Sequence, residues 1–178
     1  MTRRVMAFGV GCFMLGAVTA NGLPQARKAT FSPALVAGKE PKEAASALLE
    51  GALELAENGS WERIAVGRAW YLSGDREKGQ AMFDAVTANN RAEGSDWLRL
   101  GRIYAEAGEW DKAQGAFDQA LKKNANDDSL MIEYGALANI KGERGRAEAL
   151  FEKAMKREPR EFWYWVAAGG SYLGVRPQ

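Results

Sequence analysis

Apolar residues recur along the chain at helical spacing, and short polar breaks separate the apolar segments. Three of these breaks pair a glycine with an acidic residue, and each pair lies 34 residues after the one before it. The pairs are Gly74-Asp75, Gly108-Glu109 and Gly142-Glu143. On both sides of each break, apolar positions three and four residues apart indicate amphipathic helices, and the glycine indicates a tight turn. The pattern predicts a helical hairpin that the chain repeats.

The breaks define three full units, at about residues 60–93, 94–127 and 128–161. Small and aromatic residues align between the units in three columns. The columns are Gly67, Gly101 and Gly135 in the first helices, Gly79, Ala113 and Ala147 in the second helices, and Phe83, Phe117 and Phe151 one turn later. Glycine inside a helix costs about 1 kcal/mol relative to alanine. Its recurrence therefore predicts close approach of the paired helices, with phenylalanines filling the space where these helices diverge.

The middle unit contains the spacing Trp-x2-Leu-Gly-x2-Tyr, followed by Ala-x3-Phe. These two runs lie at Trp97–Tyr104 and Ala113–Phe117. They resemble the tetratricopeptide repeat family position for position. The third unit keeps most of the pattern and ends at Pro159, whereas the first unit is divergent, with Arg63 in place of the tryptophan and Arg91 in place of the proline.

Half units extend the resemblance past both ends of the full units. Their positions are Ala45, Leu49 and Ala52 before the first full unit, and Trp165, Gly169 and Tyr172 after the last. The resemblance thus covers residues 41–174 and leaves residues 175–178 as a tail. It implies an all-α fold, a right-handed superhelical stack of helix-turn-helix repeats.

The N-terminal stretch has a different pattern. A basic head precedes an apolar run, Val5–Ala20, that ends in small residues. This composition is typical of a Sec-type signal peptide over residues 1–20, with cleavage after Ala20. The alternative is an uncleaved membrane anchor, although the run is shorter than the roughly 20 residues that span a bilayer. Residues 21–40 predict a flexible linker with one helical turn near Pro33. We therefore expect a periplasmic or secreted protein, tethered to the membrane only if the signal is retained.

Composition and charge narrow the classes of function. The 178 residues are 47% hydrophobic and 26% charged, which is typical of a globular domain. The net charge of +1 gives no overall attraction to nucleic acid. The chain has no histidine, and its one cysteine, Cys12, lies in the expected signal peptide. We therefore expect no enzyme, no catalytic residues, no metal or cofactor, and no membrane insertion after signal cleavage.

The resemblance also implies that the first helices line a concave face, where helical spacing identifies the side chains of a mostly apolar trough. The candidate partner-binding residues are Trp61, Ile64, Arg68, Tyr71, Leu98, Arg102, Ile132, Asn139, Trp163 and Val166. We expect Trp61 to be exposed. Two interpretations are open for Arg68 and Arg102, which lie one repeat apart: they grip an acidic or carbonyl group of a partner, or they pair with neighbours such as Glu106.

Residues 162–166 place five large apolar side chains in succession. Either the aromatic rings pack back onto the third unit, or Phe162, Trp163 and Trp165 form a docking patch for a partner or a homodimer. Together the patterns predict a non-catalytic adaptor that binds a peptide or helix of another protein in its concave groove and assists an envelope or secretion-related complex. The alternative is a structural module that self-associates through the C-terminal aromatic helix.

Overall fold

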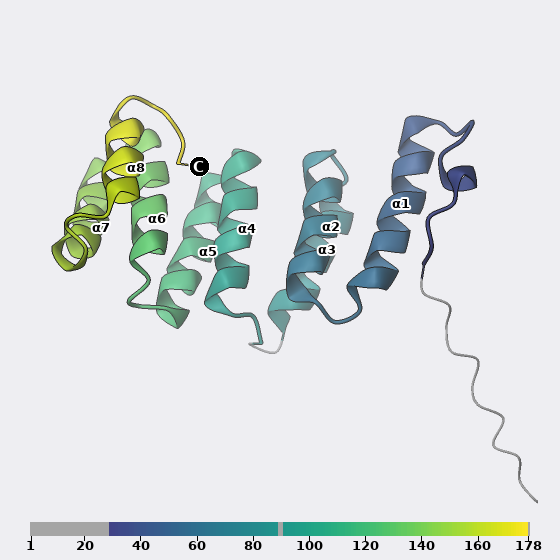
Figure 1. Ribbon diagram of the computed structural model, residues 1–178, viewed down its shortest axis with the longest axis horizontal. Coiled ribbons are helices and arrows are strands. Elements are labelled where there is room, and N and C mark those ends of the chain that lie inside the picture. Colours follow the sequence, from purple (N-terminus) through teal and green to yellow (C-terminus); the bar gives the residue numbers. More distant parts are fainter. Residues whose placement is uncertain (1–28, 89–90, 178) are drawn as a thin grey trace, which may run out of the picture.

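The computed structural model describes residues 29–88 and 91–177, so the expected signal peptide lies outside the described residues. Within this part of the chain all regular structure is helical, and the helices stack in chain order (Figure 1). A 3-10 turn, η1 (Pro33–Leu35), lies against the first helix, α1 (Pro41–Ala56). None of the described helices is long and apolar enough to cross a bilayer.

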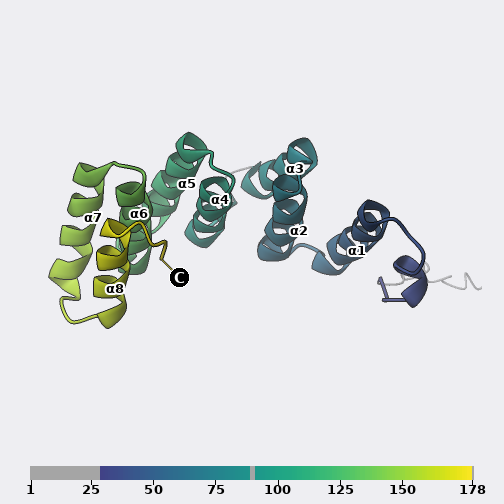
Figure 2. The ribbon, with the colours of Figure 1, turned by 90° about the horizontal axis from the view of Figure 1, so that it is seen from above.

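Each expected full unit contains one pair of helices. The pairs are α2 (Ser60–Leu72) with α3 (Arg76–Thr87), α4 (Gly94–Glu106) with α5 (Trp110–Lys123), and α6 (Asp128–Ile140) with α7 (Arg144–Arg157). The last helix, α8 (Phe162–Tyr172), packs on α6. In Figure 1, α2 and α4 lie in front of α3 and α5. Figure 2 shows that the row bends, so that α1 and α8 at its two ends lie toward the face formed by α2 and α4.

The repeated glycine-acid pairs form the turns inside the hairpins. Gly74, Gly108 and Gly142 adopt φ angles of +104°, +80° and +88°, a conformation that favours glycine because it has no Cβ. The acidic residue after each glycine is the N-cap of the second helix. Its negative charge there complements the positive end of the helix dipole. The 34-residue spacing of these pairs therefore sets the length of each unit.

Glycine and phenylalanine fit together inside every full unit. A Cβ atom on the first-helix glycine would lie only 2.6–2.7 Å from the phenylalanine ring of the same unit. The pairs are Gly67 with Phe83, Gly101 with Phe117, and Gly135 with Phe151. The rings therefore fill the notch left by each missing side chain. This corrects the expectation that they fill the space where the helices diverge.

Aromatic side chains also join one unit to the next. Phe117 of α5 stacks on Tyr134 of α6 with ring centroids 4.9 Å apart, and Trp110 packs beside both rings. Burial, the largest cause, raises the pKa of Tyr134 to about 12. Its hydroxyl is therefore neutral at physiological pH and donates to the carboxylate of Asp118 at 3.0 Å. The core runs continuously through the stack, as expected when single hairpins cannot bury enough apolar surface.

Candidate functional site: a groove on the face of the first helices

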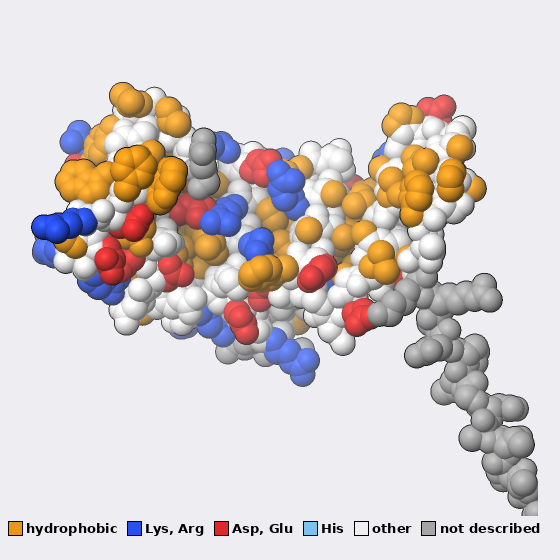
Figure 3. Space-filling model, viewed as in Figure 1, with side chains coloured by type: hydrophobic (Ala, Val, Ile, Leu, Met, Phe, Trp, Pro, Cys, Tyr) orange, Lys and Arg blue, Asp and Glu red, His pale blue; other side chains and the backbone are white. Residues whose placement is uncertain are grey.

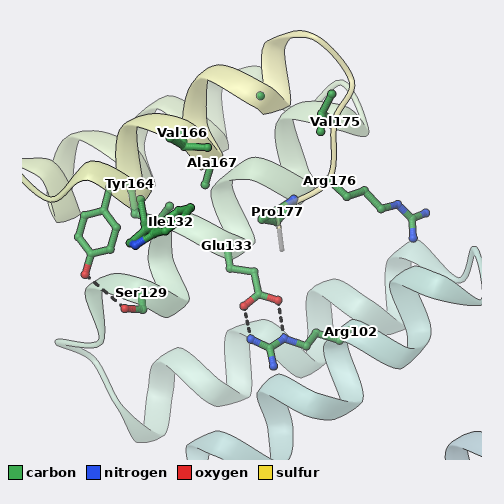
Figure 4. Close-up of a pocket in the computed structure, with 12 residues that line it drawn as sticks. Arg102, Ser129, Ile132, Glu133, Tyr164, Val166, Ala167, Val175, Arg176 and Pro177 are labelled. Atoms are coloured by element: carbon green, nitrogen blue, oxygen red, sulfur yellow. Dashed lines mark hydrogen bonds and ion pairs between the residues drawn. The ribbon is translucent and has the colours of Figure 1, made fainter.

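The face formed by the first helices is hollowed between α4, α6 and α8 (Figure 3). The hollow has a volume of about 440 Å³, and we call it the groove. Its lining residues are Arg102, Ser129, Ile132, Glu133, Trp163, Tyr164, Val166, Ala167, Gly170, Val175, Arg176 and Pro177. Figure 4 shows Val166 and Ala167 on α8 above Ile132 of α6, with the C-terminal segment beside them. Apolar side chains thus enclose a space that is open to solvent.

An ion pair crosses the groove from α4 to α6 (Figure 4). Arg102 Nε donates to Glu133 Oε1 at 2.5 Å, and Arg102 Nη2 donates to Oε2 of the same carboxylate. Such a two-point contact fixes the guanidinium plane. The hydrogen bond with Glu133 raises the pKa of Arg102. The pair therefore gives the groove a polar edge with little net charge.

A second, smaller hollow continues the same face between α2 and α4. It has a volume of about 270 Å³ and shares Arg102 with the groove. On its rim, Arg68 pairs with Glu106 at 2.5 Å. Trp61 is half exposed, as expected, and the Arg99 guanidinium lies 3.7 Å from the centre of its ring, a cation-π contact. Apolar surface with paired charges therefore extends along three first helices.

The structure shows which carboxylates of the chain pair with Arg68 and Arg102. Arg68 pairs with Glu106, the neighbour named in the second interpretation, and Arg102 pairs with Glu133. Both arginine side chains keep about half of their surface exposed. Because each guanidinium already has a carboxylate partner, an acidic ligand could bind either arginine only by displacing that partner.

Several expected groove residues belong to the core instead. Tyr71 is 2% exposed, and its hydroxyl donates to Glu109 Oε2 at 2.6 Å. Ile64 and Ile132 are 2% and 3% exposed and contribute only to the floors of the two hollows. Their assignment as direct partner contacts is therefore corrected, since buried side chains offer almost no surface to a ligand.

The remaining expected residues differ in exposure. Leu98 is half-buried and packs against the core. Asn139 is also half-buried and donates to Ser171 Oγ on α8 at 2.9 Å, so it joins α6 to α8. Trp163 and Val166 line the groove and are 66% and 48% exposed. With Trp61, which is 50% exposed, these two residues of α8 are the large apolar side chains among the expected contacts that stay accessible.

The aromatic run at the start of α8 does not pack back onto the third unit as a whole. Phe162, Trp163 and Trp165 are 64%, 66% and 62% exposed. Only Tyr164 turns inward, with its hydroxyl 3.3 Å from Ser129 Oγ (Figure 4). The packing-back interpretation is therefore wrong for three of the four rings.

Two parts of the groove were missed from the sequence. Glu133 lies on the same face as Arg102 because it follows Arg102 by 31 residues, which is one repeat less about one helical turn, a spacing that could have identified it. The C-terminal segment, expected as a tail, supplies Val175, Arg176 and Pro177 to the groove. It turns back at Gly174, where φ is +75°, and Val175 N donates to Gly170 O at 2.9 Å. A glycine just after a helix is a recognisable signal for such a turn.

Comparison with protein families agrees with this geometry. Residues 95–137 match the family model described as tetratricopeptide repeat. No curated protein and no solved structure gives a significant match to the chain. The matched segment includes most of α4, all of α5 and the start of the next hairpin, and the same hairpin occurs before and after it. The family match and the repeated hairpins around it support a tetratricopeptide repeat protein.

Proposed function

We propose that this protein is a non-catalytic adaptor that binds a peptide or helix of another protein in the groove. Tetratricopeptide repeats mediate protein-protein interactions, and repeat stacks use extended concave surfaces for binding. The observation that supports this site is the hollow of about 440 Å³ beside the exposed side chains of Trp163 and Val166. Large exposed apolar side chains around a concavity are typical of an interaction surface.

The chemistry of the groove favours an apolar anchor on the partner. Its walls are largely apolar, and the charge of Arg102 is balanced by Glu133. An acidic ligand would have to compete with this intramolecular carboxylate for the guanidinium. A helix with one apolar face, flanked by polar side chains that meet the ion pair, fits the groove without that competition.

The place of action that we propose is outside the cytoplasm, in an envelope or secretion-related complex. Support comes from the N-terminal pattern of a basic head, an apolar run and small residues. The intact mass of the protein isolated from its native cells tests this proposal. We expect a chain that begins at Asn21, and a chain that retains residues 1–20 would contradict cleavage.

A pair of matched variants tests the groove. Val166→Glu places a charge in the groove, on a side chain that is 48% exposed. Ala149→Glu places the same charge on an exposed position of α7 outside the groove. We expect crosslinked capture of the partner from native cells to fall at least about tenfold for Val166→Glu, because an unpaired charge would be buried at the contact. Capture by Ala149→Glu should equal that of the wild type.

Equal capture by both variants, with unchanged helical circular dichroism, would overturn the groove as the binding site. Equal loss in both would show that the substitutions act through folding or solubility. The comparison therefore separates a local contact from a general defect.

A further inference from the structure

The last helix of the stack, α8, keeps the kind of face that a second helix covers in the full units, but most of this face is exposed. In each full unit, the second helix covers the first-helix glycine and the positions beside it. In α6 these positions are Met131, Gly135 and Ala138, which are all buried. The residues 34 positions later in α8 are Trp165, Gly169 and Tyr172. Trp165 and Tyr172 are 62% and 50% exposed, and a Cβ atom on Gly169 would meet nothing within 4 Å.

The first helix of the stack, α1, also has an exposed face, and this face is complementary to that of α8. In register with the second helices, α1 carries a face made of small and aliphatic residues. These are Ala45, Leu48, Leu49 and Ala52, which align with Ala147, Leu150, Phe151 and Ala154 of α7. Three of the four α7 residues are buried, whereas Ala45 and Leu48 of α1 are exposed and the other two are half-buried. Thus α1 has the face of a second helix, and no described first helix precedes it.

The described residues before α1 leave Leu48 on this face 42% exposed. Ala29 approaches α1 at Gly51, where a Cβ atom would lie 3.5 Å from the Ala29 Cβ. In register, Gly51 corresponds to Lys153, an exposed position on the outer side of α7. Ala29 therefore lies on the outer side of α1, away from the face at Leu48.

We propose that two copies of this chain associate head to tail, with α1 of one copy packing on the exposed face of α8 of the other, in the place that a second helix takes in the full units. Leu49 would rest on Gly169 as Phe151 rests on Gly135. Figure 1 shows that α8 ends and α1 begins at the same edge of the stack, so the new pair would be antiparallel like the others. Such a contact joins two different surfaces and continues the existing stack.

Charge favours the same arrangement. In the joined stack, α1 of the second copy would lie beside α7 of the first. The α7 segment contains five basic and two acidic residues, whereas α1 contains three acidic residues and one basic residue. Helices of opposite net charge attract one another across an interface and disfavour the wrong orientation. This proposal does not depend on the groove, which lies on another face of α8.

Sedimentation velocity of the purified protein over a broad dilution series tests the proposal. We expect the wild-type mass to rise with concentration. Gly169→Leu fills the notch that Leu49 would occupy and should leave a monomer at every concentration. Gly115→Leu is the matched control, because Gly115 is also an exposed helical glycine with nothing within 4 Å of its Cβ position. It should associate like the wild type, and both variants should keep the helical circular dichroism.

A mixing experiment determines which surfaces meet. Leu48→Glu blocks the α1 face and leaves α8 intact, while Gly169→Leu blocks α8 and leaves α1 intact. Each variant alone should be monomeric, and an equimolar mixture should form a dimer that grows no further. A dimer of Leu48→Glu alone would show that α8 pairs with α8 and would overturn the proposal. A wild-type monomer at all concentrations would overturn it as well.

Discussion

Replacing Phe117 with alanine is expected to lower the free energy of unfolding by about 3–5 kcal/mol. The Phe117 ring is fully buried, fills the notch at Gly101 and stacks on Tyr134 of the next unit. Its removal would leave a cavity that Gly101 cannot fill because it has no side chain. The loss should therefore weaken both the hairpin and the junction between two units. Urea unfolding followed by circular dichroism measures the change.

Phe162→Ala is the control for this prediction. The ring of Phe162 is 64% exposed, so its loss should change the free energy of unfolding by no more than about 0.5 kcal/mol. Similar losses for Phe117→Ala and Phe162→Ala would contradict the packing described above.

Gly101→Ala is expected to destabilise the protein by about 1–3 kcal/mol, the range for overpacking a core. Alanine is the better helix former by about 1 kcal/mol, so the sign of the effect depends on packing. The new Cβ would lie 2.6 Å from the Phe117 ring, and this buried ring is held against Trp110 and Tyr134. The ring cannot move away without disturbing the next unit. Thermal and urea unfolding measure the loss.

Gly115→Ala is the matched substitution on the outer side of α5. Its Cβ would meet nothing within 4 Å, so helix propensity alone should act and stabilise the protein by about 0.5–1 kcal/mol. Opposite signs for the two substitutions are the expected result. If Gly101→Ala also stabilised the protein, the idea that Gly101 is needed for the close approach of α4 and α5 would be wrong.

The hairpins could be predicted from the sequence because their signals are local. A glycine at positive φ, an acidic N-cap and apolar residues at helical spacing each act within a few residues. Repetition at Gly74, Gly108 and Gly142 then fixed the length of the unit. The contact of phenylalanine with glycine was less accessible, because it depends on how closely two helices approach.

The groove was harder to predict because it depends on how units pack on one another. Helical spacing placed Tyr71 on the binding face, but packing between units points it to Glu109, the N-cap of α5 in the next hairpin. Spacing also could not choose between the two interpretations of Arg102, since the position of Glu133 depends on the angle between α4 and α6. The C-terminal segment was missed because a short polar tail carries no periodic pattern.

Site-specific photocrosslinking in native cells tests the central claim, that the groove holds a partner protein, most directly. A photoreactive amino acid would replace Trp163, which lines the groove, or Gln119, which is exposed on α5 outside it. The account predicts a discrete protein adduct from position 163 and none from position 119. An adduct from position 119 with none from position 163 would contradict it.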